Sequence, residues 1–188
     1  PTRRSSDLDM AIEWYRKALE SSVTKELKGH VYNRLGDIYY QKIYDGGMSY
    51  DVNQAVIYYN QAVDLDNNDA CFSLGNMYKI GEGVLKNPVR AKELFLKSAE
   101  FGNEKAQYEL GMMCKGKNNL VETFRWMKQS AENNYAPAQY ELGLMYYYGK
   151  GVAKNSRMAA DWLEKSYNAG NEDAKKVWNG LQLWKYKQ

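Results

Sequence analysis

The sequence predicts an all-α protein built from a helix pair that is repeated along the chain. Three observations carry this prediction. Two short phrases alternate at one period, each phrase has the apolar spacing of a helix, and glycine recurs at a fixed register inside the first phrase. Alternating phrases at a single period are typical of repeat proteins in which each repeat packs on its neighbours.

The two phrases differ in their anchor residues. The first phrase reads VYNRLGDIY, ACFSLGNMY, AQYELGMMC and AQYELGLMY, starting at Val31, Ala70, Ala106 and Ala138, with a weaker AKKVWNGLQ at Ala174. These starts are 39, 36, 32 and 36 residues apart. The second phrase reads AIEWYRKAL, AVIYYNQAV, AKELFLKSA, TFRWMKQSA and AADWLEKSY, starting at Ala11, Ala55, Ala91, Thr123 and Ala159.

Each phrase has helical periodicity and helix-end signals. Ala70, Leu74 and Met77 follow the i, i+4, i+7 spacing of one apolar helix face. Asn caps and an N-terminal Pro favour helix starts, and Gly favours the left-handed residue after a helix. The predicted starts are Asn87-Pro88 and Asn155-Ser156, the predicted stops are Gly102 and Gly170, and the predicted loops within pairs are Gly81-Glu82-Gly83 and Gly149-Lys150-Gly151.

The recurring helix glycines predict close contact between helices. A mid-helix Gly costs roughly 1 kcal/mol relative to Ala, so recurrence at one register suggests that a neighbouring helix leaves no room for a side chain. These glycines are Gly36, Gly75, Gly111 and Gly143. The aromatics Trp14, Tyr58, Trp126 and Trp162, with Leu94 at the same register, are interpreted as core residues wedged between paired helices.

Composition excludes several classes of function. The chain of 188 residues carries a net charge of +3, one His and two Cys. This charge is too small for a nucleic-acid or membrane footprint, and no apolar run approaches the ~20 residues of a membrane span. A single His excludes a multi-histidine metal cluster, so no metal or cofactor is expected.

The phrases resemble Sel1-like repeats, a branch of the tetratricopeptide-like solenoids. The shared patterns are A-x-x-x-L-G-x-x-Y-x-x-G-x-G-V and A-x-x-W/L-x-x-K-x-A-x-x-G-N, best seen in Ala70–Asn103 and Ala138–Asn171. The resemblance covers nearly everything after Asp9 and implies a right-handed superhelical α-solenoid of stacked antiparallel helix pairs. The third repeat departs from the pattern, since it lacks four residues of the Gly-x-Gly-Val loop and has Cys114 where others have Tyr.

The predicted organisation is one solenoid over residues 9–188 behind a separate leader. It comprises a half repeat 9–28, repeats 30–68, 69–104, 105–136 and 137–172, and a C-terminal capping helix 173–187, to which Leu181, Leu183, Trp184 and Tyr186 contribute. The first complete repeat is expected to carry extra loop residues near 44–50 and a longer inter-repeat segment at 21–29. Residues 1–8, PTRRSSDL, are interpreted as a non-native or disordered leader on a truncated chain. Under that interpretation, the absence of a signal peptide from this sequence does not indicate the cellular compartment of the protein.

Catalytic interpretations are weak. Cys71 and Cys114 lie in different repeats and at different registers, which favours free thiols and differs from the cysteine-stapled branch of the family. His30 is interpreted as a helix-start surface residue, and Glu109 and Glu141 as repeated solvent-face residues rather than a carboxylate pair. The Gly-x-Gly loops lack the flanking strand and Lys-Ser/Thr of a phosphate site.

The resemblance implies that the first helices line the concave side of the solenoid. Positions two before, two after and five after each Leu of the Leu-Gly pairs then face a groove: Asn33, Asp37, Tyr40, Phe72, Asn76, Lys79, Tyr108, Met112, Lys115, Tyr140, Leu144 and Tyr147. Phe72, Tyr108 and Tyr140 form an aromatic row that Trp184 extends. An alternative reading packs these aromatics between neighbouring first helices, with only their hydroxyls in water.

These features predict a non-catalytic, monomeric scaffold or adaptor. Its partner would be a protein, bound through a peptide or helix in the groove, and neither nucleic acid nor a membrane span is expected. The alternative is a cell-envelope or peptidoglycan-associated, hydrolase-like role, as in cysteine-rich Sel1-like relatives.

Overall fold

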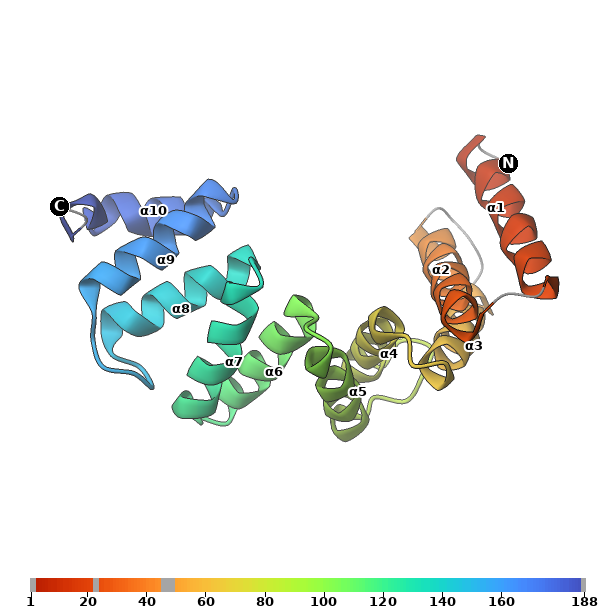
Figure 1. Ribbon diagram of the computed structural model, residues 1–188, viewed down its shortest axis with the longest axis horizontal. Coiled ribbons are helices and arrows are strands. Elements are labelled where there is room, and N and C mark those ends of the chain that lie inside the picture. The colour runs from red at the N-terminus through yellow and green to blue at the C-terminus, as the bar shows by residue number, and fades with distance from the viewer. Residues whose placement is uncertain (1–2, 22–23, 45–49, 187–188) are drawn as a thin grey trace. The chain divides into compact units, whose positions relative to one another are not determined.

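The computed structural model describes residues 3–21, 24–44 and 50–186, and over these residues the fold is all-α. The described part contains α1 (Arg3–Glu20), α2 (Lys25–Tyr44), α3 (Tyr50–Asp64), α4 (Asn68–Ile80), α5 (Pro88–Glu100), α6 (Glu104–Gly116), α7 (Leu120–Glu132), α8 (Ala136–Tyr148), α9 (Ser156–Asn168) and α10 (Glu172–Gly180), followed by a 3₁₀ helix at Leu183–Tyr186. Figure 1 shows the order of these helices.

The chain forms two compact units, Pro1–Ser98 and Ala99–Gln188, whose border lies in the last turn of α5. In unit 1, α2 packs against α1 and α3, and α3 packs against α4. In unit 2, α6 packs against α7, α7 against α8, and α8 against α9, with α10 closing on α9. Within each unit, these contacts join helices that follow one another in the chain, as expected for a stack of helix pairs.

A repeated hydrogen bond fixes the antiparallel pairing. Near the C-terminal ends of the second helices α5, α7 and α9, a buried serine hydroxyl donates to the carbonyl of the first residue of the paired first helix. The three bonds are Ser98 Oγ to Asn68 O at 2.8 Å, Ser130 Oγ to Glu104 O at 2.7 Å, and Ser166 Oγ to Ala136 O at 2.7 Å. The end of one helix thus lies beside the start of its partner.

The helix glycines are the points of closest approach within pairs, which confirms the prediction. A Cβ added at Gly36 would lie 2.6 Å from the Tyr59 ring, and one at Gly143 would lie 2.6 Å from Leu163 Cγ. At Gly75 and Gly111 the obstructing side chains are Phe95 and Met127, each 2.8 Å away. The residue that fills the space thus varies from Tyr to Phe, Met and Leu, while the glycine is kept.

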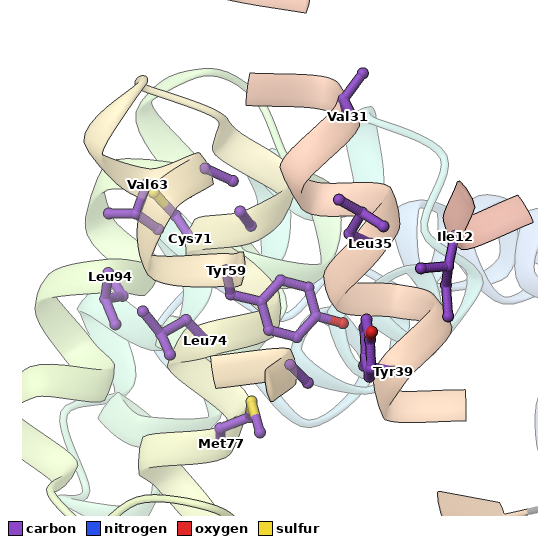
Figure 2. Close-up of a cluster of buried hydrophobic side chains, with 13 residues drawn as sticks. Ile12, Val31, Leu35, Tyr39, Tyr59, Val63, Cys71, Leu74, Met77 and Leu94 are labelled. Atoms are coloured by element: carbon purple, nitrogen blue, oxygen red, sulfur yellow. The ribbon is translucent and has the colours of Figure 1, made fainter. Parts of the chain in front are cut away.

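The apolar core is continuous within unit 1. Leu35 and Leu74, the residues before two of these glycines, are fully buried, and Tyr59 is 3% exposed. Figure 2 shows the Tyr59 ring among these buried side chains. In unit 2, one cluster forms around Met127, Leu142 and Trp162 and another around Leu163, Trp178 and Leu183.

The interpretation of the aromatic register as core is correct for Trp162 and Leu94, which are buried, but wrong for Trp14. Tyr58 and Trp126 are half-buried. Trp14 is 72% exposed, because α1 has no described helix before it in the chain, whereas Trp162 packs in a cluster with Leu142 and Met145 of the preceding α8. Lys17 lies over the exposed Trp14 ring, 5.5 Å from its centroid.

Asparagine caps define the predicted helix starts. Asn87 Oδ1 accepts a hydrogen bond from the Arg90 amide, and Asn155 Oδ1 accepts one from the Met158 amide. Gly102 and Gly170 have φ of +87° and +89°, in the left-handed region that favours glycine after a helix.

The two ends of the chain differ from the sequence interpretation. α1 begins at Arg3, so residues 3–8 are helical rather than a disordered leader, because Leu8 continues the apolar spacing of Ile12 and Leu19. The idea of a non-native origin stays a prediction, which sequencing of the source transcript tests. At the other end α10 stops at Gly180 and Gln182 adopts a φ of +50°, so the closing segment is broken rather than one helix over 173–187.

The predicted irregularities fall mainly in loops. The extra residues near 44–50 lie mostly outside the described residues. The inter-repeat segment at 21–29 is largely absorbed into α2, which begins at Lys25. The shortened loop of the third repeat is the three-residue link Lys117–Asn119, in which Asn118 has a φ of +55°.

Candidate functional site

The first helices α2 and α4 in unit 1 and α6 and α8 in unit 2 carry the twelve predicted groove positions. In each unit separately, we call the surface on which these positions lie its first-helix face. Eleven of the twelve side chains are exposed or half-buried, and Asn33 is buried, with 5% exposed. Asn33 therefore does not belong to the exposed part of this surface, whereas Phe72, Tyr108 and Tyr140 at the same register are half-buried.

The aromatic row is partly embedded in the fold. Phe72 lies against Phe95 with ring centroids 5.9 Å apart, and Tyr108 makes an edge-on contact with Tyr135 at 5.3 Å. Burial raises the pKa of Tyr108 and of Tyr140. The partner rings belong to the second helix α5 and to the link before α8, so the aromatic row and its packing alternative both stay predictions. Trp184, which was predicted to extend the row, is 45% exposed.

A pocket of about 240 Å³ lies on the first-helix face of unit 1. It is lined by Asp37, Tyr40, Tyr59, Ser73, Asn76 and Met77, and we call it the unit-1 pocket. Three of the predicted groove residues, Asp37, Tyr40 and Asn76, thus come together here. Tyr59, Ser73 and Met77 were not predicted.

Hydrogen bonding in the unit-1 pocket centres on a carboxylate. The Tyr59 hydroxyl donates to Asp37 Oδ1 at 3.0 Å, and Arg34 donates to Asp37 Oδ2 at 3.2 Å. Burial raises the pKa of Asp37, and the two donors oppose that rise. Burial, followed by the neighbouring Asp37 charge, raises the pKa of Tyr59. The Tyr40 hydroxyl donates to Glu82 Oε2 at 2.8 Å, which places a second acid at the rim.

A second pocket, of about 190 Å³, lies on the first-helix face of unit 2. It is lined by Lys115, Leu120, Thr123, Tyr140, Glu141, Leu144, Met145, Tyr148 and Lys150, and we call it the unit-2 pocket. It brings together three further groove residues, Lys115, Tyr140 and Leu144. The end of α6, the start of α7, the middle and end of α8 and the following loop all contribute to it.

The unit-2 pocket is apolar inside and basic at its rim. Lys115 Nζ lies 2.7 Å from Glu141 Oε2, so the carboxylate in the pocket is already paired. Lys150 lies over the Tyr148 ring, 5.4 Å from its centroid. Glu141 was interpreted as a solvent-face residue, but its side chain is only 18% exposed. The sequence signal that could have revealed this pair is a lysine near the end of one first helix, Lys115, and a glutamate in the next first helix, Glu141.

The remaining candidate residues stay apart from the two pockets. His30 is exposed, and its Nδ1 lies 3.3 Å from Asn67 Nδ2. Cys71 and Cys114 are free thiols, as predicted, and burial raises the pKa of Cys71. Within the described residues, no three His, Cys, Asp or Glu side chains are grouped so that they could hold a metal ion. None of the described helices combines the length and apolarity that crossing a membrane requires.

Comparisons with known proteins agree with this architecture. The family model of the Sel1 repeat matches residues 2–23, 30–67, 68–103, 104–135 and 136–171. A Sel1 repeat protein from Oxalobacter formigenes is 33% identical, with a TM-score of 0.62 over 66% of this chain and 96% of that one.

Two further structures share the fold. The protein c5321, a protective antigen of uropathogenic Escherichia coli with an SLR fold, is 26% identical with a TM-score of 0.64, over 94% of this chain and 48% of that one. MamA resembles this chain in fold alone. The two are 22% identical, with a TM-score of 0.52 over 92% of this chain and 94% of MamA. Stacked helix pairs, the repeated glycine contacts and the family match across most of the sequence lead to one conclusion: the chain belongs to the Sel1 repeat family, as a TPR-like α-solenoid.

Proposed function

We propose that the protein is a non-catalytic scaffold that binds a peptide segment of a partner protein on its first-helix face. Sel1 repeat proteins generally mediate protein–protein interactions. The observation that carries the proposal is the clustering of predicted groove residues in one pocket of each unit: Asp37, Tyr40 and Asn76 in unit 1, and Lys115, Tyr140 and Leu144 in unit 2.

The size of the pockets supports a peptide ligand. Sites for small molecules typically measure ~300–1,000 Å³, whereas these pockets measure about 240 and 190 Å³. A cavity of about 150 Å³ holds a benzene ring, so each pocket fits a single side chain. Rigid aromatics beside a few amides and charges are the composition expected of an anchor surface for a partner segment.

The test begins with peptides selected from a random displayed library on the intact protein. The variant Leu144→Lys/Tyr148→Ala changes two residues that line the unit-2 pocket, and Tyr148 is 58% exposed, so the fold should tolerate its loss. We expect selected peptides to lose at least tenfold in affinity for this variant.

The matched control is Tyr186→Ala, which removes another exposed tyrosine, 46% exposed and outside both pockets. It should bind like the parent protein. Circular dichroism should remain helical in all variants. Unchanged peptide affinity in the double variant, and in the corresponding unit-1 variant Tyr40→Ala/Asn76→Ala, would refute the proposed function.

A further inference from the structure

The two pockets occupy equivalent places in their repeats. Counted from the Leu of each Leu-Gly pair, Tyr40 corresponds to Lys115, Asn76 to Leu144, Met77 to Met145 and Glu82 to Lys150. The loops that frame the pockets also have the same backbone bonding. The amides of Glu82 and Lys150 donate to Met77 O and Met145 O, and the amides of Asn87 and Asn155 donate to Tyr78 O and Tyr146 O.

The shared backbone holds side chains of opposite charge. The unit-1 pocket contains the Asp37 carboxylate and has Glu82 at its rim, with Arg34 as the cation bound to Asp37. The unit-2 pocket contains Lys115 and Lys150, and its one acid, Glu141, is paired with Lys115. Lys154, over the Tyr147 ring at 5.5 Å, adds a further cation beside the same helix. An occupant of the unit-2 pocket therefore meets a net positive rim.

The interior of the unit-2 pocket is fit for an apolar side chain. Leu120, Leu144 and Met145 line it, together with the rings of Tyr140 and Tyr148. The backbone of Lys150 is fixed by the fold, because its amide is bonded to Met145 O at 2.9 Å and a Cβ at the adjacent Gly151 would collide with the Leu120 carbonyl. The exposed Lys150 side chain therefore starts from a fixed point beside an apolar cavity of about 190 Å³.

The geometry points to a specific occupant of the unit-2 pocket: a peptide in which an apolar, preferably aromatic, residue is followed by an acidic one. The apolar side chain fills the cavity while the carboxylate lies near Lys150, the cation that Glu141 does not pair. The unit-1 pocket, with its acids, rejects the same sequence. This assignment rests on the proposed function and names the chemistry of the peptide that it requires.

The test uses blocked dipeptides at millimolar concentration with the full chain labelled with ¹⁵N. Acetyl-Phe-Asp-amide and acetyl-Phe-Asn-amide are nearly isosteric and differ in charge, and acetyl-Ala-Asp-amide lacks the ring. We expect the Phe-Asp peptide to shift the amide signals of Leu144, Met145 and Tyr148. Its affinity should exceed that of Phe-Asn by about two- to fivefold, the range of exposed ion pairs, and salt should erase the difference. Acetyl-Ala-Asp-amide should produce no saturable shift.

The variant Lys150→Glu installs the charge found at the equivalent position of unit 1 and should abolish or reverse the preference for Asp over Asn. Lys128→Glu makes the same charge change on α7 outside the pocket and should preserve the preference. Equal affinity for Phe-Asp and Phe-Asn, preference for acetyl-Phe-Lys-amide, or absence of any saturable shift in the unit-2 pocket would overturn the assignment. Library peptides that depend on the first-helix face but lack an acid after an apolar residue would overturn it while leaving the proposed function intact.

Discussion

Lys115 at the end of α6 forms an ion pair with Glu141 in the middle of α8, with 2.7 Å between Nζ and Oε2. The pair joins two successive first helices across the unit-2 pocket. It also neutralises the one acid of that pocket, which leaves Lys150 as the cation available to a ligand.

A double-mutant cycle should detect this pair. We expect Lys115→Gln and Glu141→Gln to show a coupling free energy of about 0.2–1 kcal/mol, because Lys115 remains 46% exposed and water screens the charge. Urea unfolding of the four proteins measures it. A cycle for Lys128 and Glu132, whose charged atoms are 3.8 Å apart on an exposed face of α7, should give a smaller coupling. Equal couplings would contradict a structural role of the Lys115–Glu141 pair.

Gly143→Ala should destabilise unit 2. The new Cβ would lie 2.6 Å from Leu163 Cγ and 3.2 Å from the Leu163 amide, so both side chain and backbone must move. Overpacking of this kind costs ~1–3 kcal/mol, and only ~1 kcal/mol is recovered from helix propensity. Gly116→Ala is the matched control at the end of α6, where an added Cβ meets nothing within 4 Å. Thermal unfolding should show a lower Tm for the first variant and an equal or higher Tm for the second.

Ser130→Ala should lower the stability of unit 2 by removing the hydrogen bond between the end of α7 and the start of α6. It removes the donor to Glu104 O from a fully buried position, at an expected cost of about 1–3 kcal/mol. Ser21→Ala removes an exposed hydroxyl that donates to Ala18 O, and its effect should stay within about 0.5 kcal/mol. Denaturant midpoints compare the two, and similar shifts would show that the buried bond adds little.

Asp66 should make the stability of unit 1 depend on acid pH. Hydrogen bonds and charge from Lys25 and Lys97 lower the pKa of Asp66 from 3.8 to about 2. The stabilising contribution of the Asp66 carboxylate is therefore complete above 3.8, its pKa in the unfolded chain, and is lost as the pH falls through about 2, its pKa in the folded protein. Urea midpoints measured from pH 5 downwards should fall more steeply for the parent protein than for Asp66→Asn. Parallel curves would contradict the linkage, and Asp64→Asn, at an exposed neighbour, should follow the parent.

The repeat architecture was predictable because packing constraints recur locally. Each complete pair keeps a glycine at one register of its first helix, and asparagine precedes most helix starts from α4 onwards, although Tyr135 precedes α8. Gly75, Gly111 and Gly143 therefore indicate the fold from the sequence alone. The pockets were predictable only in part. The register of the first helices predicts that Lys115, Tyr140 and Leu144 share one face, but it does not predict which side chains of other segments complete the pocket. Glu141 was missed because its environment comes from a side chain 26 positions away in the preceding repeat.

Two residues mark the limits of inference by register. Trp14 shares the register of the buried Trp162 but is exposed, because burial depends on whether another helix covers the position. Asn33 shares the register of Tyr108 and Tyr140 but is buried, whereas those two tyrosines are half-buried. Repeat position fixes a direction from the helix axis, whereas neighbours fix the exposure.

The contact of Gly151 with the Leu120 carbonyl has a consequence for recombining such proteins. The loop after α8 completes a pocket whose other walls come from α6, α7 and α8, so the cavity straddles the boundary between repeats 105–136 and 137–172. Exchange of one of these whole repeats between related proteins would transplant only part of the cavity and leave mismatched walls. A graft that begins inside α6 and ends after the loop at residue 155 would carry the complete pocket. The segment that must be moved to transfer binding is therefore offset from the segment that forms one structural repeat.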